Sequence, residues 1–143
     1  SRIGDSGVHL IDTPGIDEID GAERERLAHQ VAGRADLVLF VVDGDLTATE
    51  GEALRLLTAE RRPTLLVLNK ADQYTAGERA ALIERLAEKS RGLVAPGAVL
   101  AASALPSPRR VIRIDARGQE SESIERPEPD VAALRERIYE VLA

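Results

Sequence analysis

Apolar residues along this chain gather into four short runs, and segments with helical spacing separate them. The runs are VHLID at residues 8–12, DLVLFVVD at 36–43, PTLLVLN at 63–69 and AVLAA at 98–102. Near-continuous apolar runs of this length are typical of strands that are buried on both faces of a parallel sheet. We therefore expect four strands, each followed by polar residues.

Three helices are predicted between the runs, each from a local start signal. An acid or a threonine is followed three positions later by glutamate, a pattern that pairs otherwise unbonded backbone N–H groups. The pairs are Asp20 and Glu23, Thr49 and Glu52, and Thr75 and Glu78. Strands that alternate with helices predict right-handed βαβ units. The expected fold class is α/β, with an open, mostly parallel sheet flanked by helices.

The last third of the chain has a different pattern. Residues 111–116 alternate, with Ile112 and Ile114 on one side, and Arg117 and Gly118 can form a turn before a polar stretch. This alternation predicts an exposed hairpin. We treat residues 106–129 as a hairpin insertion in one domain that spans residues 1–143.

A final helix is predicted after Pro127 and Pro129. We expect Asp130 to be its N-cap. Its buried stripe is expected to contain residues at helical spacing, namely Val131, Leu134, Ile138 and Val141.

Composition narrows the classes of function. The chain has 143 residues, no cysteine, two histidines and a net charge of -6. The absence of cysteine excludes disulfides and thiolate zinc sites, and His9 and His29 are too few to suggest a metal cluster. An acidic chain without a basic stripe is a poor candidate for direct nucleic-acid binding. No apolar run approaches the roughly 20 residues of a membrane span, so we expect a cytoplasmic protein. Membrane association of the full protein stays open as an alternative, although no residue here supports it.

Polar motifs follow three of the apolar runs. Asp12-Thr13-Pro14-Gly15 follows the first, Asn69-Lys70-Ala71-Asp72 the third, and Ser103-Ala104 the fourth. Ligands of open α/β sheets bind outside the carboxyl ends of the strands. We therefore expect the three motifs to lie along one edge of one sheet.

The order D-x-x-G, N-K-x-D and S-A resembles the GTPases of the Era, Der and TrmE type, in the translation-factor-like P-loop superfamily. The resemblance covers almost the whole chain except about residues 106–129. A lone D-x-x-G is weak evidence, whereas N-K-x-D directly after an apolar strand is specific. The presence of three motifs in this order strengthens the resemblance. The resemblance implies GTP or GDP and Mg²⁺ as ligands.

By this resemblance, one set of residues binds the nucleotide: Asp12, Thr13, Gly15, Asn69, Lys70, Asp72, Ser103, Ala104 and Leu105. Asp72 would accept hydrogen bonds from the N1–H and N2 amino groups of guanine, and the Ala104 N–H would donate to the guanine carbonyl. Adenine lacks that pair of donors, and such sites discriminate by about 10⁴-fold. Asn69 would bridge the base and the neighbouring loops, and the stem of Lys70 would cover the base plane. The plainer alternative is that Asn69 and Asp72 form only a turn and a helix cap.

The first motif implies roles at the phosphates. Asp12 would hold Mg²⁺, usually through a water, and Gly15 would bring its N–H to the γ-phosphate. Residues 16–26 would be the second switch and would contact a protein partner. Ile16 stands where Ras-like GTPases have a glutamine that orients water, and it has no hydrogen-bonding group. No catalytic residue is therefore assigned. The plainer alternative for Asp12 is a strand-end cap.

The sequence contains no G-x-x-x-x-G-K-[ST] stretch to cradle phosphates. We expect truncation to explain this, so that the chain is the part of a G domain after the first switch and is inactive alone. The alternatives are a non-hydrolysing pseudo-GTPase or a protein-interaction module with this fold. A response regulator would leave N-K-x-D unexplained.

Overall fold

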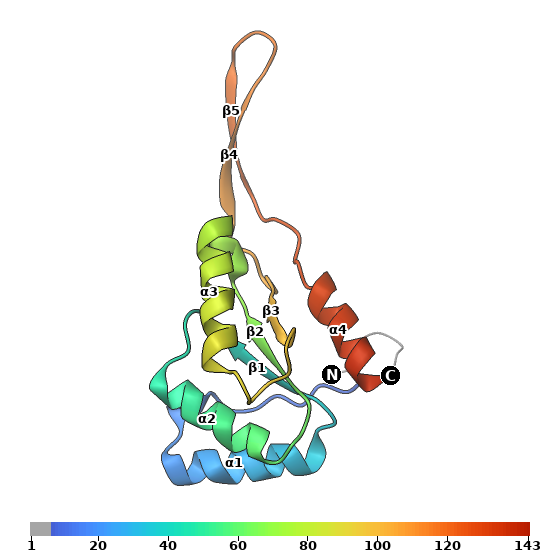
Figure 1. Cartoon of the computed structure of the whole chain (residues 1–143). Helices are drawn as coiled ribbons and strands as arrows, with labels where there is room; N and C mark the ends of the chain where they lie inside the picture. Colours follow the sequence, from blue (N-terminus) through green and yellow to red (C-terminus); the bar gives the residue numbers. More distant parts are fainter. Residues whose placement is uncertain (1–6) are drawn as a thin grey trace.

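The computed structural model describes residues 7–143 (Figure 1). Its α-helices and 3-10 helices are η1 (Ile16–Glu18), α1 (Gly21–Arg34), α2 (Ala48–Ala59), η2 (Ala71–Gln73), α3 (Ala76–Lys89) and α4 (Ala132–Leu142). Its strands are β1 (Val38–Val42), β2 (Thr64–Leu68), β3 (Val99–Ala101), β4 (Arg109–Ile114) and β5 (Glu120–Glu125). Within the described residues, no helix is long and apolar enough to cross a membrane.

Three strands form a parallel sheet in the order β1-β2-β3. Val42 pairs with Leu68 at the end of β1, and Leu66 pairs with Val99 at the start of β3. Every residue of the central strand β2 is buried. The expected α/β class with a parallel sheet flanked by helices is therefore confirmed.

The expected strand at residues 8–12 is wrong for the part of the chain that the structure describes. That segment contains only an isolated bridge position at His9, and Leu10 and Ile11 are 47% and 60% exposed. A strand needs a run of consecutive backbone pairings with a neighbour, and this segment has one bridge position. Instead, the segment runs beside a hollow of about 1110 Å³ that it lines together with β1. We call this space the edge hollow; Val41 of β1 is 52% exposed there.

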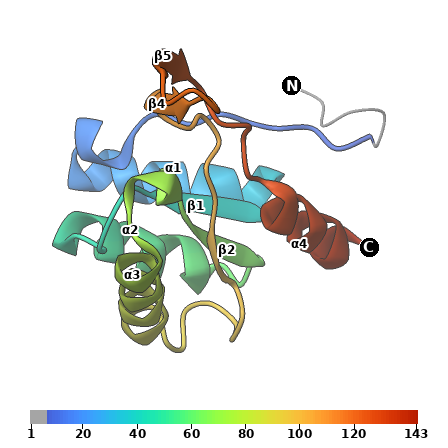
Figure 2. The same cartoon turned by 90° about the horizontal axis from the view of Figure 1, so that it is seen from above.

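Apolar side chains cover both faces of the sheet. On one face, α1, α2 and α3 pack through residues such as Ala28, Leu54 and Leu86 onto Phe40 and Leu66. On the other face, α4 contributes a buried stripe of Ile138 with half-buried Val131, Leu134 and Val141. Figure 2 shows α3 and α4 on opposite sides of the strands. The predicted stripe of the last helix is confirmed.

The helix starts follow the predicted chemistry with two corrections. Asp20 accepts from the Glu23 N–H, and Thr75 and Glu78 form a capping box, both as predicted. The box of α2 is Thr47 with Glu50, not Thr49 with Glu52. The earlier start lets the half-buried Leu46 pack against the core, beside Gly51.

The second correction concerns α4. Its N-cap is Val131 without a side-chain cap, not Asp130. The backbone of Asp130 is instead paired with Ser103 in an isolated antiparallel bridge. Two backbone bonds hold Asp130 in this bridge, and the helix starts at Ala132, one residue later than an N-cap at Asp130 would place it.

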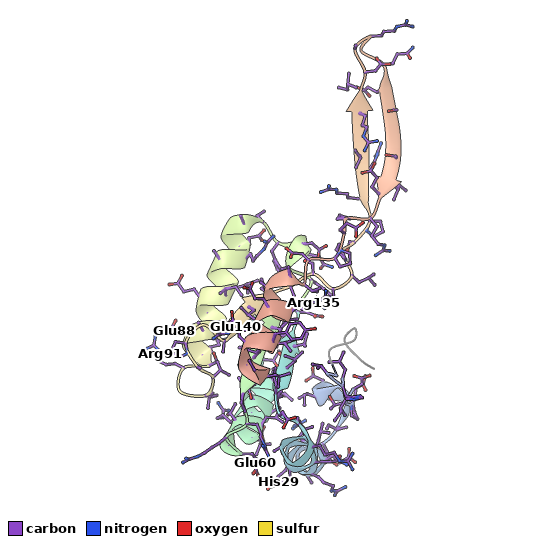
Figure 3. All side chains as sticks on the ribbon, turned by 90° about the vertical axis from the view of Figure 1, so that its right-hand side faces the viewer. His29, Glu60, Glu88, Arg91, Arg135 and Glu140 are labelled. Atoms are coloured by element: carbon purple, nitrogen blue, oxygen red, sulfur yellow. The ribbon has the colours of Figure 1, made fainter. Side chains whose placement is uncertain are left out.

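β4 and β5 pair as an antiparallel hairpin, which we call the ribbon, and it projects away from the sheet and its helices (Figure 1 and Figure 3). Asp115 accepts from the N–H groups of Arg117 and Gln119, and Gly118 takes a left-handed φ of 77° in the turn. Ion pairs of Arg110 with Glu122 and of Arg113 with Glu125 link the two strands. The exposed hairpin expected from the alternation is therefore present.

Candidate nucleotide site

Residues of two predicted motifs meet where β2 and β3 end. The Asn69 N–H donates to the Val42 carbonyl at 2.8 Å, and the Ala71 N–H donates to the Ala102 carbonyl at 3.1 Å. These bonds extend the sheet pairing past the strand ends and place both motifs at one edge. We call Asn69, Lys70, Asp72, Ser103 and Ala104 the strand-end cluster.

Two side-chain bonds join the loops of this cluster. Asn69 Oδ1 accepts from the Ala104 N–H at 3.1 Å, and Ser103 Oγ accepts from the Asp72 N–H at 3.1 Å. Ser103 is buried and Asn69 is half-buried. Asn69 therefore bridges the neighbouring loop, and Ser103 shapes it. The Ala104 N–H is already used within the protein, whereas the Leu105 N–H has no hydrogen-bond partner among the described residues.

Lys70 links the cluster to the end of β1. Its backbone takes a left-handed φ of 58°, and its Nζ lies 3.0 Å from Asp43 Oδ2. The Tyr74 hydroxyl donates to the Asp43 carbonyl at 2.7 Å. Our sequence prediction missed Asp43 and Tyr74, although Asp43 follows an apolar run as the other motifs do.

Asp72 presents an exposed carboxylate at the outer side of the cluster. Its Oδ2 accepts from the Ser107 N–H at 3.1 Å, and its Oδ1 has no hydrogen-bond partner among the described residues. Leu105 lies between Ala104 and Ser107 in the same loop and is 72% exposed. One carboxylate oxygen is thus free, and the other is held by the chain that leads to the ribbon. No sequence signal pointed to Ser107.

The first motif does not join this cluster. Asp12, Thr13 and Gly15 line the edge hollow, which Asp43 and Gly44 at the end of β1 also line. Asp12 Oδ1 accepts from the Thr13 N–H at 3.0 Å, and no hydrogen bond connects the motif to Asn69 or Asp72 within residues 7–143. The expectation that all three motifs follow strand ends of one sheet therefore holds for two of them, because residues 8–12 form no strand.

Acidic side chains at this edge are engaged by lysines. Lys89 Nζ lies 3.1 Å from Asp45 Oδ2, and this hydrogen bond is the main cause of a lowered pKa for Asp45, opposed by partial desolvation. The Leu46 N–H also donates to Asp45. Among the described residues, no group of three or more His, Cys, Asp or Glu side chains is placed to hold a metal ion.

Comparison with known proteins finds similarity over just under half of the chain. Residues 1–70 match the model of the family described as "50S ribosome-binding GTPase". The chain is 38% identical over 68 residues to GTPase Der of Streptococcus suis (strain 05ZYH33) and 37% identical over 68 residues to GTPase Der of Streptococcus thermophilus (strain CNRZ 1066). Each match covers 44% of this chain and 16% of the Der protein.

The chain thus spans about a sixth of the length of these relatives. No solved structure matches it. The sequence match includes the Asp12-Thr13-Pro14-Gly15 motif and reaches Lys70 in the second motif. Together with the parallel sheet flanked by helices, this similarity supports an Era/Der-like GTPase G domain.

Proposed function

We propose that this chain recognises the guanine base of GTP and GDP and belongs to a switch GTPase that hydrolyses GTP. The observation that carries the proposal is the strand-end cluster: Asn69 bridges to Ala104, Ser103 to Asp72, and one oxygen of Asp72 is free. The family match supports guanine-nucleotide binding in general.

The chemistry of the cluster suits guanine. Asp72 offers two acceptor oxygens, of which only Oδ2 has a partner, and an oxygen of a carboxylate can accept a second hydrogen bond. The N1–H and N2 amino groups of guanine would fill those sites. The guanine carbonyl would then take an N–H from the loop. Either Asn69 releases the Ala104 N–H, or the unpaired Leu105 N–H donates in its place.

The first motif fits a role at Mg²⁺ and the phosphates. Asp12 is exposed, and its Oδ2 has no partner among the described residues, so this oxygen can accept a metal-bound water. Mg²⁺ is commonly held by one or two carboxylates together with substrate phosphates, and it would neutralise charge on the phosphate oxygens. Asp12 is the residue of this chain that would hold it.

The same account assigns a partner surface. Residues 16–26 follow Gly15 and include η1 and the start of α1, whose N-cap Asp20 is exposed. Loss of the γ-phosphate would release this segment, and we propose that a protein partner reads the change. Ile16 has no hydrogen-bonding group, so the attacking water is oriented by another element.

A nucleoside titration tests base recognition apart from the phosphates. The ¹⁵N-labelled chain is titrated with guanosine and, separately, with adenosine, and amide shifts are followed by NMR. We expect guanosine to shift residues 69–72 and 103–107, and adenosine to leave them unchanged at equal concentration. Equal responses to the two nucleosides, or guanosine shifts confined to other regions, would contradict the proposal.

A further inference from the structure

Both ends of the ribbon are attached to the strand-end cluster. β4 begins five residues after Ala104. After β5 ends at Glu125, the chain returns to the cluster through residues 126–130. There, Ser103 and Asp130 exchange two backbone hydrogen bonds of 2.9 Å each. The loop with the S-A motif is therefore paired directly with the chain that leaves the ribbon.

A second attachment lies between the two ends. Arg126 Nη1 donates to the Pro106 carbonyl at 2.7 Å. The Pro106 side chain is fully buried, so this point is fixed in the body of the domain. Arg126, which follows β5, therefore ties the chain that returns from the ribbon to the chain that leads into β4.

The third attachment reaches Asp72. The Ser107 N–H donates to Asp72 Oδ2 at 3.1 Å, and Gln73 Nε2 lies 3.4 Å from Ser107 Oγ. The Pro106 carbonyl and the Ser107 N–H belong to one peptide group, which is planar and, like every peptide in the described chain, not cis. One rigid peptide is thus held between a guanidinium on its oxygen and a carboxylate on its N–H.

We propose that Arg126 is a positioning residue for guanine recognition, acting through the Pro106–Ser107 peptide on the Asp72 carboxylate. The inference rests on the proposed function. The charges on both sides match the dipole of the peptide, because a cation meets its oxygen and an anion meets its N–H, and hydrogen bonds in such chains polarise one another. The bond fixes the carboxylate plane before a base arrives, which lowers the ordering cost of binding.

This arrangement also makes the ribbon part of the base site. The peptide that orients Asp72 is held from residue 126, directly after β5 ends. A change in how the ribbon leaves the body would move Arg126 and, with it, the peptide. We therefore expect the ribbon and the base loops to respond to guanine as one unit.

The test compares Arg126→Ala and Arg126→Lys with Arg117→Ala in the full 143-residue chain. Arg117 lies in the ribbon turn, and its side chain makes no hydrogen bond among the described residues, so it serves as the matched control. The first readout needs no ligand: amide hydrogen exchange at Ser107. We expect exchange at Ser107 to quicken in Arg126→Ala, to be partly restored in Arg126→Lys, and to stay unchanged in Arg117→Ala.

The second readout is the ratio of the affinities for guanosine and inosine, measured by NMR titration. Inosine lacks the 2-amino group, so the ratio reports the bond from that group to Asp72. We expect the ratio to fall about fivefold in Arg126→Ala, which corresponds to the net free energy of one lost hydrogen bond. The ratio should stay unchanged in Arg117→Ala. Folding is checked by the amide spectrum of the β2 core.

The outcomes separate the inference from the proposed function. If the wild-type chain does not prefer guanosine and Asp72→Asn leaves the nucleoside affinities unchanged, the proposed function and the inference are both overturned. If Asp72→Asn abolishes the preference but Arg126→Ala leaves both the ratio and Ser107 exchange unchanged, only the inference is overturned. Faster exchange at Ser107 with an unchanged ratio also overturns it, because the bond would then be structural only.

Discussion

Single side chains at the carboxyl ends of the strands hold the loops in place without a ligand. Lys70 pairs with Asp43, and Lys89 at the end of α3 pairs with Asp45, so two lysines contact the segment that follows β1. The side chains of these pairs are 36–63% exposed, and such pairs contribute little to stability individually. The Lys70 pair ties the loop of the second motif to the end of β1, and the Lys89 pair ties α3 to the same segment.

Asp45 gives a prediction for the pH dependence of stability. Its pKa is lowered in the folded state, first by the hydrogen bond from Lys89, so its contribution is present above the unfolded pKa of about 3.8 and is lost as the pH falls through the folded pKa. We expect Asp45→Asn to lower the free energy of unfolding at pH 7 by less than about 1 kcal/mol, because the pair is partly exposed. The difference should vanish once the pH lies below the folded pKa of Asp45. Urea unfolding over a series of falling pH values measures it; a constant difference would contradict the assignment.

Ile16 gives a second prediction at this scale. It is half-buried and packs against the core formed by α1, α2 and β1. We expect Ile16→Ala to lower the free energy of unfolding by about 1 kcal/mol, less than a fully buried site would lose. In a form of the protein that includes a phosphate loop, GTP turnover should change by less than about 10²-fold, because the isoleucine side chain can neither donate nor accept a proton. Abolished hydrolysis with intact folding and affinity would show that Ile16 has a direct role.

Among the secondary-structure elements, α2 shows where local sequence signals compete. Two overlapping T-x-x-E patterns lie at the start of this helix. We predicted Thr49 with Glu52 as the capping box, whereas the structure uses Thr47 with Glu50. Local capping chemistry is the same for both pairs. The choice depends on Leu46, whose packing against the core is a tertiary contact that no local pattern encodes.

The two threonines make a matched pair for a test of this start. Thr47→Ala removes the cap, and we expect it to lower the free energy of unfolding by about 1 kcal/mol. Thr49→Ala lies within the helix and should change it by less than about 0.5 kcal/mol. Urea unfolding of both variants decides between the two starts, since the predicted order would reverse if Thr49 were the cap.

The ribbon is an element without a core of its own. Ile112 and Ile114 share one face with Ile124, and all three are more than half exposed, at 54%, 66% and 78%. Because they bury little area, Ile114→Thr should change the free energy of unfolding by less than about 0.5 kcal/mol. Leu66→Ala in the fully buried β2 should cost about 3 kcal/mol. A large loss from Ile114→Thr in urea unfolding would mean that the ribbon supports the domain.

At the scale of the whole molecule, the sequence predicted the parallel sheet, its flanking helices and the polar residues after β2 and β3. These features depend on apolar runs and strand ends, which are local patterns. The run at residues 8–12 has the same pattern but only one bridge position, at His9, so the pattern alone gave a wrong prediction there. The contacts of Ser107 and Arg126 with the site join residues that are 35 and 20 positions from their partners, and no periodicity announces them.

The most direct test of guanine recognition exchanges the ligand and the residue together. Xanthosine carries a carbonyl where guanosine carries the 2-amino group, and the amide of Asp72→Asn can donate to that carbonyl while the carboxylate cannot. Affinities of both nucleosides for both forms of the chain are measured by NMR titration. We predict that the wild type prefers guanosine and that Asp72→Asn prefers xanthosine. An unchanged preference for guanosine in the variant would contradict the central claim that Asp72 reads the base.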